Sequence, residues 1–170
     1  MTDGRIIESS DRAHEILGAI KNVFTNFGIP FKEHADEEAL MVKSALMLGD
    51  KGDLKVILQA SIDIECKAVQ IFLEVYEPIP SEKSTQVNRL MGILNGWSVT
   101  GHLFTYDDQL YYHSTILIRD SGFNKEEFEK VFAVVYGTGP ECCSLIKRVI
   151  DKDEDAKVLL GELFSKMFES

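Results

Sequence analysis

The first part of the chain has an apolar pattern that changes from a helical period to a strand period. Between positions 10 and 27 the apolar residues recur at steps of three and four, as Ile16, Leu17, Ile20, Val23, Phe24 and Phe27. A stripe of this kind is typical of a helix with one buried face. Gly28 and Pro30 follow directly, and they predict that the helix ends there.

A period of two begins at Leu40 and is clearest over residues 54–65, where apolar and polar residues alternate. This alternation predicts a half-buried strand. Residues 69–75 repeat it after a short turn at residues 65–67. The segment from Leu40 to Val75 therefore predicts three antiparallel strands in a meander.

A second helix is indicated after the sheet is interrupted by Pro78 and Pro80. Ser81 is its candidate N-cap, and Asn95 with Gly96 provides its stop signal. Two more alternating segments follow on either side of residues 107–108, and they predict a hairpin.

The last part of the chain begins with a strong helix signal. Asn124 is a candidate N-cap, Glu127 completes a capping box, and Phe123 and Phe128 have the spacing of a hydrophobic staple. The GTGP segment at residues 137–140 predicts an interruption of this helix. We expect two further helical segments, over residues 140–150 and 153–168.

The predicted order is α-β-β-β-α-β-β-α, followed by a helical extension. It indicates an α+β fold, in which helices lie on one face of a five-stranded antiparallel sheet. A chain of 170 residues fits one domain. Within residues 1–170 we expect an α+β core over residues 10–150 and a C-terminal helical extension over residues 151–170.

The net charge and the cysteine content restrict which binding partners and which cellular compartment we expect. The 28 Asp and Glu residues against 18 Lys and Arg residues give a net charge of -10, which disfavours nucleic acid and anionic membranes as partners. Cys66, Cys142 and Cys143 are odd in number and lack the spacing of a disulfide framework or zinc ribbon. The polar N-terminus lacks a secretory pattern. We expect a cytoplasmic protein.

Motifs that carry catalysis or hold cofactors are missing from the sequence. There is no HExxH or GxSxG motif, and the GTGP segment lacks the GK[ST] ending of a phosphate loop. The acidic residues 151–155 lack the glycine and the later glutamate of a calcium loop. His14 and His34 are expected on the surface, and Cys142 and Cys143 are expected to pack in the interior. We therefore expect no enzyme activity, no cofactor and no metal.

The hairpin yields the strongest candidate surface. Pairing about its turn places His102 opposite His113 and Phe104 opposite Tyr111 on one face. The other face, with Val99, Leu103, Leu110, Tyr112 and Ile116, is expected in the core. With outward residues of the meander, the candidate protein-binding residues are Ile57, Phe72, Tyr76, His102, Phe104, Tyr106, Tyr111 and His113.

A face that mixes aromatic and polar residues is typical of a protein contact. A second subunit, a partner protein or the C-terminal helices are the three alternatives for covering it. The leading hypothesis is an interaction or chaperone-like module, and the alternative is a small-molecule or metal-binding sensor in which His102 and His113 line a pocket. Protonation of both histidines would place like charges side by side, so we expect the covered state to weaken as pH falls.

Four stretches resemble the YbjN family, which is assigned to bacterial sensory transduction regulation. They are IPSEK at residues 79–83, NRLMGILN at 88–95, GHLFTYDDQLYYHSTILI at 101–118 and FNKEEFEKVF at 123–132. The resemblance extends over residues 16–149 and implies a fold similar to type III secretion chaperones. It also implies a protein-binding or dimerising module, a homodimer for example, with no catalytic residues to carry over. The tail beyond Ile150 departs from the family pattern.

Overall fold

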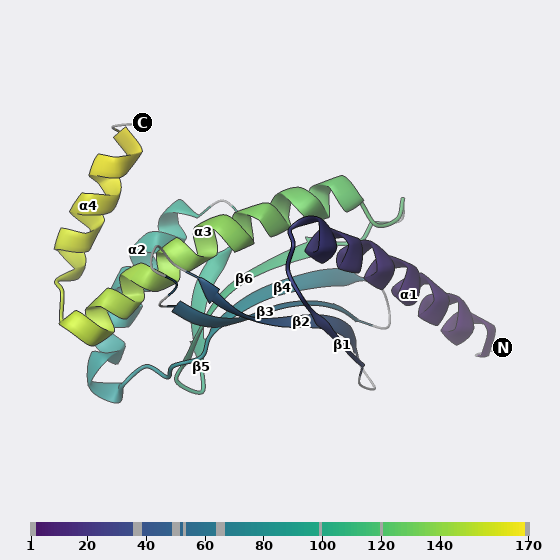
Figure 1. Ribbon diagram of the computed structural model, residues 1–170, viewed down its shortest axis with the longest axis horizontal. Coiled ribbons are helices and arrows are strands. Elements are labelled where there is room, and N and C mark those ends of the chain that lie inside the picture. The colour runs from purple at the N-terminus through teal and green to yellow at the C-terminus, as the bar shows by residue number, and fades with distance from the viewer. Residues whose placement is uncertain are drawn as a thin grey trace.

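A computed structural model shows one antiparallel sheet of six strands with helices beside it (Figure 1). It describes residues 3–35, 39–48, 52, 54–63, 67–98, 100–119 and 121–168. The strands lie in the order β1-β2-β3-β4-β6-β5. Their bounds are β1 Lys32–Ala35, β2 Ala39–Leu48, β3 Leu54–Asp63, β4 Ala68–Val75, β5 His102–Tyr106 and β6 Gln109–Leu117. The helices are α1 Asp3–Asn26, the short η1 Ser81–Lys83, α2 Ser84–Trp97, α3 Lys125–Lys152 and α4 Ala156–Phe168.

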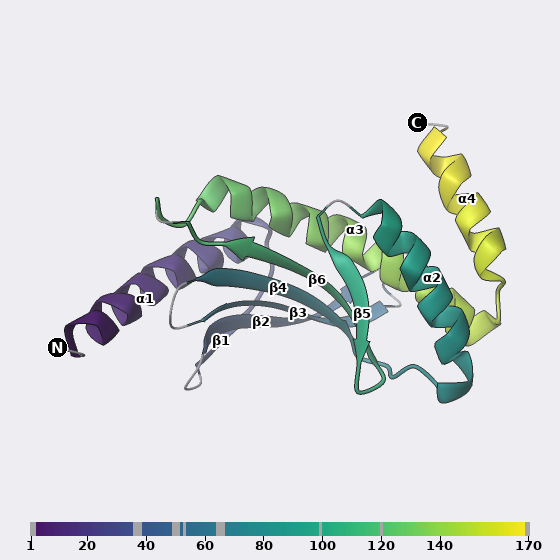
Figure 2. The same ribbon diagram turned by 180° about the vertical axis from the view of Figure 1, so that it is seen from behind.

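The helices that cover the sheet lie on one of its faces (Figures 1 and 2). Helix α1 packs on β2 and β3, and α3 crosses β3, β4 and β6. Helix α2 packs on β5 and α3, and α4 leans against α2, away from the strands. The α+β class and the one-sided arrangement are confirmed, with six strands in place of the five expected.

The additional strand is β1, which pairs with β2 at one edge of the sheet. All four of its residues are exposed, so its sequence KEHA carries no alternation between buried and solvated positions. Without that alternation the strand has no signature in the sequence. His34, expected in a surface loop, instead lies in this edge strand opposite Met41.

Helix α1 begins earlier than its apolar stripe indicates. It starts at Asp3, and its first turns extend past the edge of the sheet (Figure 1). The apolar periodicity marks the part of the helix from Ala13 onward, which carries the buried side chains. The helix ends as expected, because Gly28 adopts a left-handed conformation with φ of 67°.

The core lies between the sheet and the covering helices. In β4 the residues alternate strictly between partly buried and buried, and the buried set continues across β3 and β6. Ser44 and Ser114 are buried polar residues, and each hydroxyl donates a hydrogen bond to a backbone carbonyl, of Pro30 and of Thr100. Burial of these hydroxyls therefore leaves no polar atom unpaired.

Two helix starts test the capping predictions. Asn124 caps α3, because its side chain accepts a hydrogen bond from the Glu127 N–H at 3.1 Å, and the rings of Phe123 and Phe128 lie 5.7 Å apart. The N-cap at Asn124 and the contact between the two staple phenylalanines are thus confirmed. The cap expected at Ser81 is wrong, since that residue begins η1 and its hydroxyl contacts the Glu82 carboxylate instead.

The predicted helix break at the GTGP segment is also wrong, because α3 continues through it to Lys152. The glycine at 139 has a packing role. A Cβ atom at that position would lie 3.1 Å from a ring carbon of Tyr112, a large side chain that is fully buried in β6. The glycine therefore allows the helix to approach the sheet closely, and Pro140 is tolerated within the buried stretch of the helix.

Tyr112 is enclosed from a second side by the chain that enters β5. A Cβ atom on Gly101 would lie 2.6 Å from the Tyr112 ring, and the Tyr112 hydroxyl lies 3.1 Å from the Ser98 hydroxyl. Burial raises the pKa of Tyr112. One ring thus joins β6, α3 and the segment between α2 and β5.

We predict that Gly139→Ala destabilises the fold by about 1–3 kcal/mol, because the Tyr112 ring is held between two glycines and cannot move away from a new methyl group. Gly137→Ala is the matched control, since a Cβ atom there meets nothing within 4 Å. It should be neutral or stabilising by up to about 1 kcal/mol, through higher helix propensity. Urea unfolding of both variants checks this, and equal effects at the two positions would contradict it.

Candidate protein-binding face of the sheet

The face of the sheet opposite α1 and α3 carries all of the candidate site residues, and we call it the outer face. Strand register places His102 opposite His113, and His113 opposite Phe72 on its other side. It also places Phe104 opposite Tyr111, as expected from a two-residue turn. Asp107 and Asp108 form that turn with φ of 47° and 61°, the left-handed values of a tight hairpin.

Five outer-face rings form a continuous aromatic cluster across β4, β6 and β5. Phe72 stacks on His113 with centroids 4.4 Å apart, and Phe104 stacks on Tyr111 at 5.0 Å. His102 meets His113 edge to face at 5.1 Å and lies 5.8 Å from Phe104. Contacts of this kind stabilise a sheet face beyond simple burial. The hairpin therefore presents a preformed surface.

His113 is the most perturbed group in the aromatic cluster. Burial between Phe72 and its neighbours, and then the nearby charge of His102, lower the pKa of His113 from 6.5 to about 4. Its Nε2 atom lies 3.1 Å from the Thr115 hydroxyl. Burial, followed by the charges of Glu74 and Asp107, raises the pKa of Tyr111. His113 is thus neutral at physiological pH and behaves as an apolar ring.

Most of the large hydrophobic side chains that the described part of the chain exposes lie on the outer face. Four outer-face residues are more than half exposed, namely Met47 at 57%, Tyr76 at 54%, Tyr106 at 66% and Leu117 at 72%. The fifth such residue, Val158, is 58% exposed on α4. Exposed apolar groups on one face make it a candidate interaction surface.

The remaining candidates, Tyr76, Tyr106 and Ile57, lie on the outer face outside the aromatic cluster. Tyr76 lies beneath Lys55, whose Nζ atom is 3.8 Å from the ring centroid, and Tyr106 stands at the end of the hairpin. Ile57 lines a groove of about 440 Å³ at the other side of the outer face. The groove residues include Phe31, Lys32, His34, Lys43, Ala45 and Ile57. The sequence did not reveal this groove, because its wall is the strand β1 that carries no alternation.

The edge of the sheet at β5 is closed to a further strand. The side-chain amide of Asn95 donates to the Leu103 carbonyl at 2.8 Å, and its oxygen accepts from the Leu103 N–H at 2.6 Å. The Ser98 hydroxyl accepts from the Gly101 N–H at 3.2 Å. The end of α2 thus occupies hydrogen-bonding groups at the start of β5 that a docked strand would use. A partner that approaches the molecule at β5 would therefore contact the outer face and not extend the sheet by a strand.

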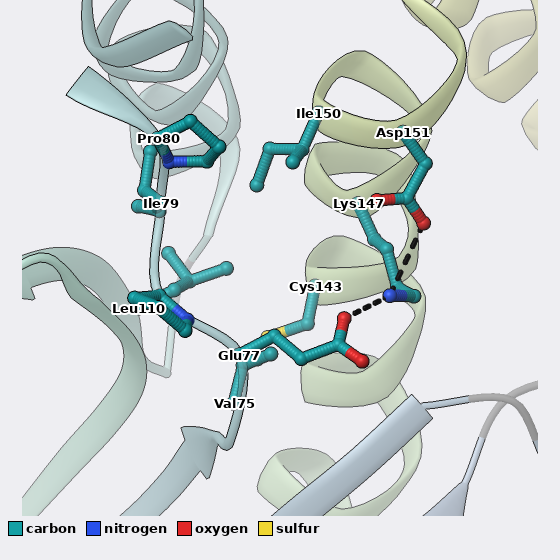
Figure 3. Close-up of a pocket in the computed structure, with 10 residues that line it drawn as sticks. Val75, Glu77, Ile79, Pro80, Leu110, Cys143, Lys147, Ile150 and Asp151 are labelled. Carbon is teal, nitrogen blue, oxygen red and sulfur yellow. Dashed lines mark hydrogen bonds and ion pairs between the residues drawn. The ribbon is translucent and has the colours of Figure 1, made fainter.

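A small pocket of about 210 Å³ lies on the opposite side, between α3 and the segment that follows β4 (Figure 3). Apolar residues such as Val75, Ile79 and Leu110 form its wall, and the buried thiol of Cys143 faces it. At its rim, Lys147 binds the carboxylates of Glu77 and, at 3.1 Å, Asp151. Because Lys147 is already paired with two carboxylates, it is not free to bind an anionic ligand at the rim.

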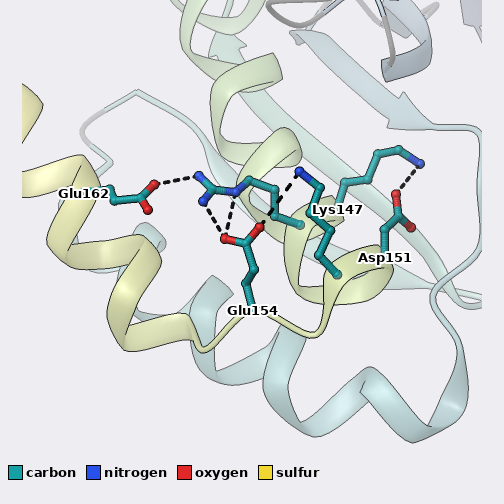
Figure 4. Close-up of polar contacts among 6 residues, drawn as sticks. Lys147, Asp151, Glu154 and Glu162 are labelled. Carbon is teal, nitrogen blue, oxygen red and sulfur yellow. Dashed lines mark hydrogen bonds and ion pairs between the residues drawn. The ribbon is translucent and has the colours of Figure 1, made fainter.

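The C-terminal extension does not cover the outer face. Buried Leu159 and Leu160 hold α4 against the rest of the molecule. Arg148 of α3 binds Glu154 through two nitrogens, at 3.1 and 2.5 Å, and Glu162 of α4 at 2.8 Å (Figure 4). These contacts fix α4 beside α2, on the side of the molecule away from the outer face. Covering by the C-terminal helices, one of the three alternatives, is therefore excluded for residues 125–168.

Three further findings bear on chemistry and location. Among the described residues, no group of three or more His, Cys, Asp or Glu side chains could hold a metal ion. Within the same part of the chain, no helix combines the length and apolar character needed to cross a bilayer.

Cys142 and Cys143 are free, and burial raises the pKa of both thiols, that of Cys142 to about 11. Val99 and Cys66 lie outside the described residues.

Comparison with known proteins yields likenesses to solved structures. A crystal structure of YbjN, described as a candidate transcription regulator of E. coli, matches with a TM-score of 0.47 and 16% identity, over 76% of this chain and 87% of that one. No protein-family model and no curated protein matches the chain. The likeness concerns the arrangement of the chain alone and shows neither a family nor an activity.

We predict that acidification destabilises the fold through His113. Unfolded histidine takes up a proton near pH 6.5, whereas folded His113 does so only near pH 4. Between these values the unfolded chain binds more protons, so stability falls as pH falls from 6.5 to 4 and the penalty is constant below. His113→Gln should flatten this dependence in urea titrations, and His34→Gln, in exposed β1, serves as the control. An NMR titration of His113 centred near pH 6.5 would contradict the account.

Proposed function

We propose that the protein is a non-enzymatic interaction module that binds another protein surface through the outer face of its sheet. The observation that carries the proposal is the aromatic cluster, which is preformed, shares the outer face with four exposed hydrophobic side chains and is left open by every helix among residues 125–168. A rigid aromatic surface loses little conformational entropy on binding, which favours its use as a contact.

Two features of the molecule support a contact through the face in preference to its edges. Asn95 bonds both backbone groups of Leu103 in β5, and Ser98 bonds the N–H of Gly101 just before the strand, so strand addition is hindered at this end of β5. At the other edge β1 has four residues, which offer few backbone groups to a partner strand. The role is that of a chaperone-like or regulatory protein. The free cysteines suit a reducing cytoplasm.

Site-specific photo-cross-linking in native lysate tests the proposal. A benzoylphenylalanine at Tyr106 places the reactive group on the outer face, and one at Val158 places it on α4 at similar exposure, 66% against 58%. We expect cross-linked protein at position 106 and none at position 158. Mass spectrometry of the product distinguishes a second copy of the chain from a different protein.

Equal cross-linking at the two positions, or none at position 106, would rule out the outer face as the contact surface. A binding defect should also follow from Phe104→Ser, which removes a ring that stacks on Tyr111 at the surface. Val131→Ser on α3, where the side chain is also partly buried, controls for loss of an apolar group elsewhere.

A further inference from the structure

A groove lies on the outer face near its β1 edge. It has a volume of about 440 Å³ and is lined by Pro30, Phe31, Lys32, His34, Lys43, Ser44, Ala45 and Ile57. Lys43 and Ala45 alternate in β2 with the buried residues Val42 and Ser44, so their side chains point to the outer face. Lys32 of β1 lies opposite Lys43 and shares this side of the sheet. We call this site the lysine groove.

The wall of the lysine groove is apolar. Ala45 and Ile57 lie opposite each other in β2 and β3. Phe31 is held in place by an edge-to-face contact with buried Phe24, with ring centroids 5.8 Å apart. Ligand sites in proteins commonly have mostly apolar walls and volumes of roughly 300–1,000 Å³. The lysine groove is thus large enough to take up an apolar side chain of a partner.

Two lysines stand at the groove without a partner. Lys32 and Lys43 are directly opposed in the strand register and form no ion pair with any residue that the structure describes. Like charges at directly opposed positions destabilise a pair of strands. Glu33 of the same strand does not relieve them, because it binds Lys21 of α1 at 2.6 Å on the helical side of the sheet. An anionic group in the groove would therefore stabilise this pair of strands.

The acids on the outer face of β3 and β4 lie too far from the two lysines to neutralise them. Glu74 is one strand away from Lys55, at the diagonal position, and two strands away from Lys43, about 10 Å across the sheet. Asp63 lies four residues, or about 13 Å, along β3 from Gln59, the register partner of Lys43. Both backbone separations exceed the screening length of about 8 Å at physiological ionic strength. The groove is therefore a locally positive site on an acidic protein.

The strand register connects the lysine groove to the aromatic cluster. Lys43 lies opposite Gln59, and Gln59 lies opposite Phe72. Phe72 stacks on His113 within the cluster. Adjacent strands are about 4.8 Å apart, so the backbone of Lys43 is about 10 Å from that of the first residue of the cluster. An extended chain covers this distance in about three residues. One segment of a partner protein can thus contact both sites.

The chemistry of the groove specifies the kind of segment. Two ammonium groups beside an apolar wall are complementary to carboxylates that flank an aromatic or aliphatic side chain. A lysine ammonium has three donors on a flexible stem, so it pairs with a carboxylate in several geometries. The net charge of -10 opposes long polyanions such as nucleic acid, whereas a short acidic segment meets the local positive charge.

We propose that the lysine groove binds an acidic segment of the partner protein. An apolar side chain of the segment packs against Phe31, Ala45 and Ile57, and its carboxylates bind Lys32 and Lys43. The inference rests on the proposed function and states the chemistry of the partner.

An NMR titration of the isotope-labelled full chain with the peptide acetyl-Glu-Phe-Glu-Glu-amide tests the proposal. We expect the amide signals of the groove residues Lys32, Lys43, Ala45 and Ile57 to shift. The dissociation constant should rise with salt, because salt screens ion pairs. The uncharged peptide acetyl-Gln-Phe-Gln-Gln-amide should bind at least about fivefold more weakly. Inorganic phosphate should leave the signals of Ala45 and Ile57 unchanged, because it has no apolar group to place against them.

A pair of charge variants separates binding from folding. Lys32→Gln with Lys43→Gln should raise the dissociation constant of the acidic peptide at least about fivefold, through loss of both ion pairs. The same variant should unfold at an equal or higher urea concentration than the wild type, because the opposed like charges are gone. Lys125→Gln with Lys130→Gln, at exposed positions of α3, changes the net charge equally and should bind the peptide as the wild type does.

No shift at the groove residues, equal affinity for the two peptides, or the same shifts with phosphate would overturn the proposal. So would a groove variant that binds as well as the wild type, or one that loses binding and stability together. Failure of the proposed function is a separate result. If position 106 cross-links to a protein while the acidic peptide does not bind, the outer face binds its partner without the lysine groove. If the peptide binds while position 106 cross-links to nothing, the groove is a site of its own and the proposed function fails.

Discussion

One constraint organises the molecule: a six-stranded antiparallel sheet whose alternate residues point to opposite sides, with helices packed on one side alone. Strict alternation in β4 sends one set of side chains into the core and the other to the outer face. Every feature assigned to function follows from the second set, because no helix among residues 125–168 reaches it. A one-sided sheet must expose its second face to water or to a partner, and here that face is rich in aromatic side chains.

On the helical side of the sheet, α3 and the chain entering β5 approach β6 closely. Tyr112 fills the space between α3 and the chain entering β5, where Gly139 and Gly101 provide the room, and its hydroxyl meets Ser98. The same region carries Asn95, which closes the β5 edge by bonding to Leu103. The same end of α2 that packs around Tyr112 thus also bonds to the start of β5. A partner is therefore expected to bind the outer face and not this edge.

Much of this arrangement is predictable from local patterns. The alternation of residues 54–75 and the pairing of His102 with His113 follow from period two and a two-residue turn. Two errors have physical causes. The GTGP segment resembles a helix stop, yet its second glycine serves contact with Tyr112, a residue distant in sequence. Strand β1 is exposed throughout, so no hydrophobic pattern marks it, and the lysine groove beside it was missed with it.

The central claim, that the outer face is covered by a protein partner, is tested most directly by hydroxyl-radical footprinting of the chain in native lysate and of the purified chain at low concentration. The account predicts that Met47, Tyr76, Tyr106 and Leu117 are protected together in the lysate, while Val158 on α4, exposed to a similar degree, stays equally reactive in both. Protection of Val158 with the four outer-face residues unchanged would contradict it.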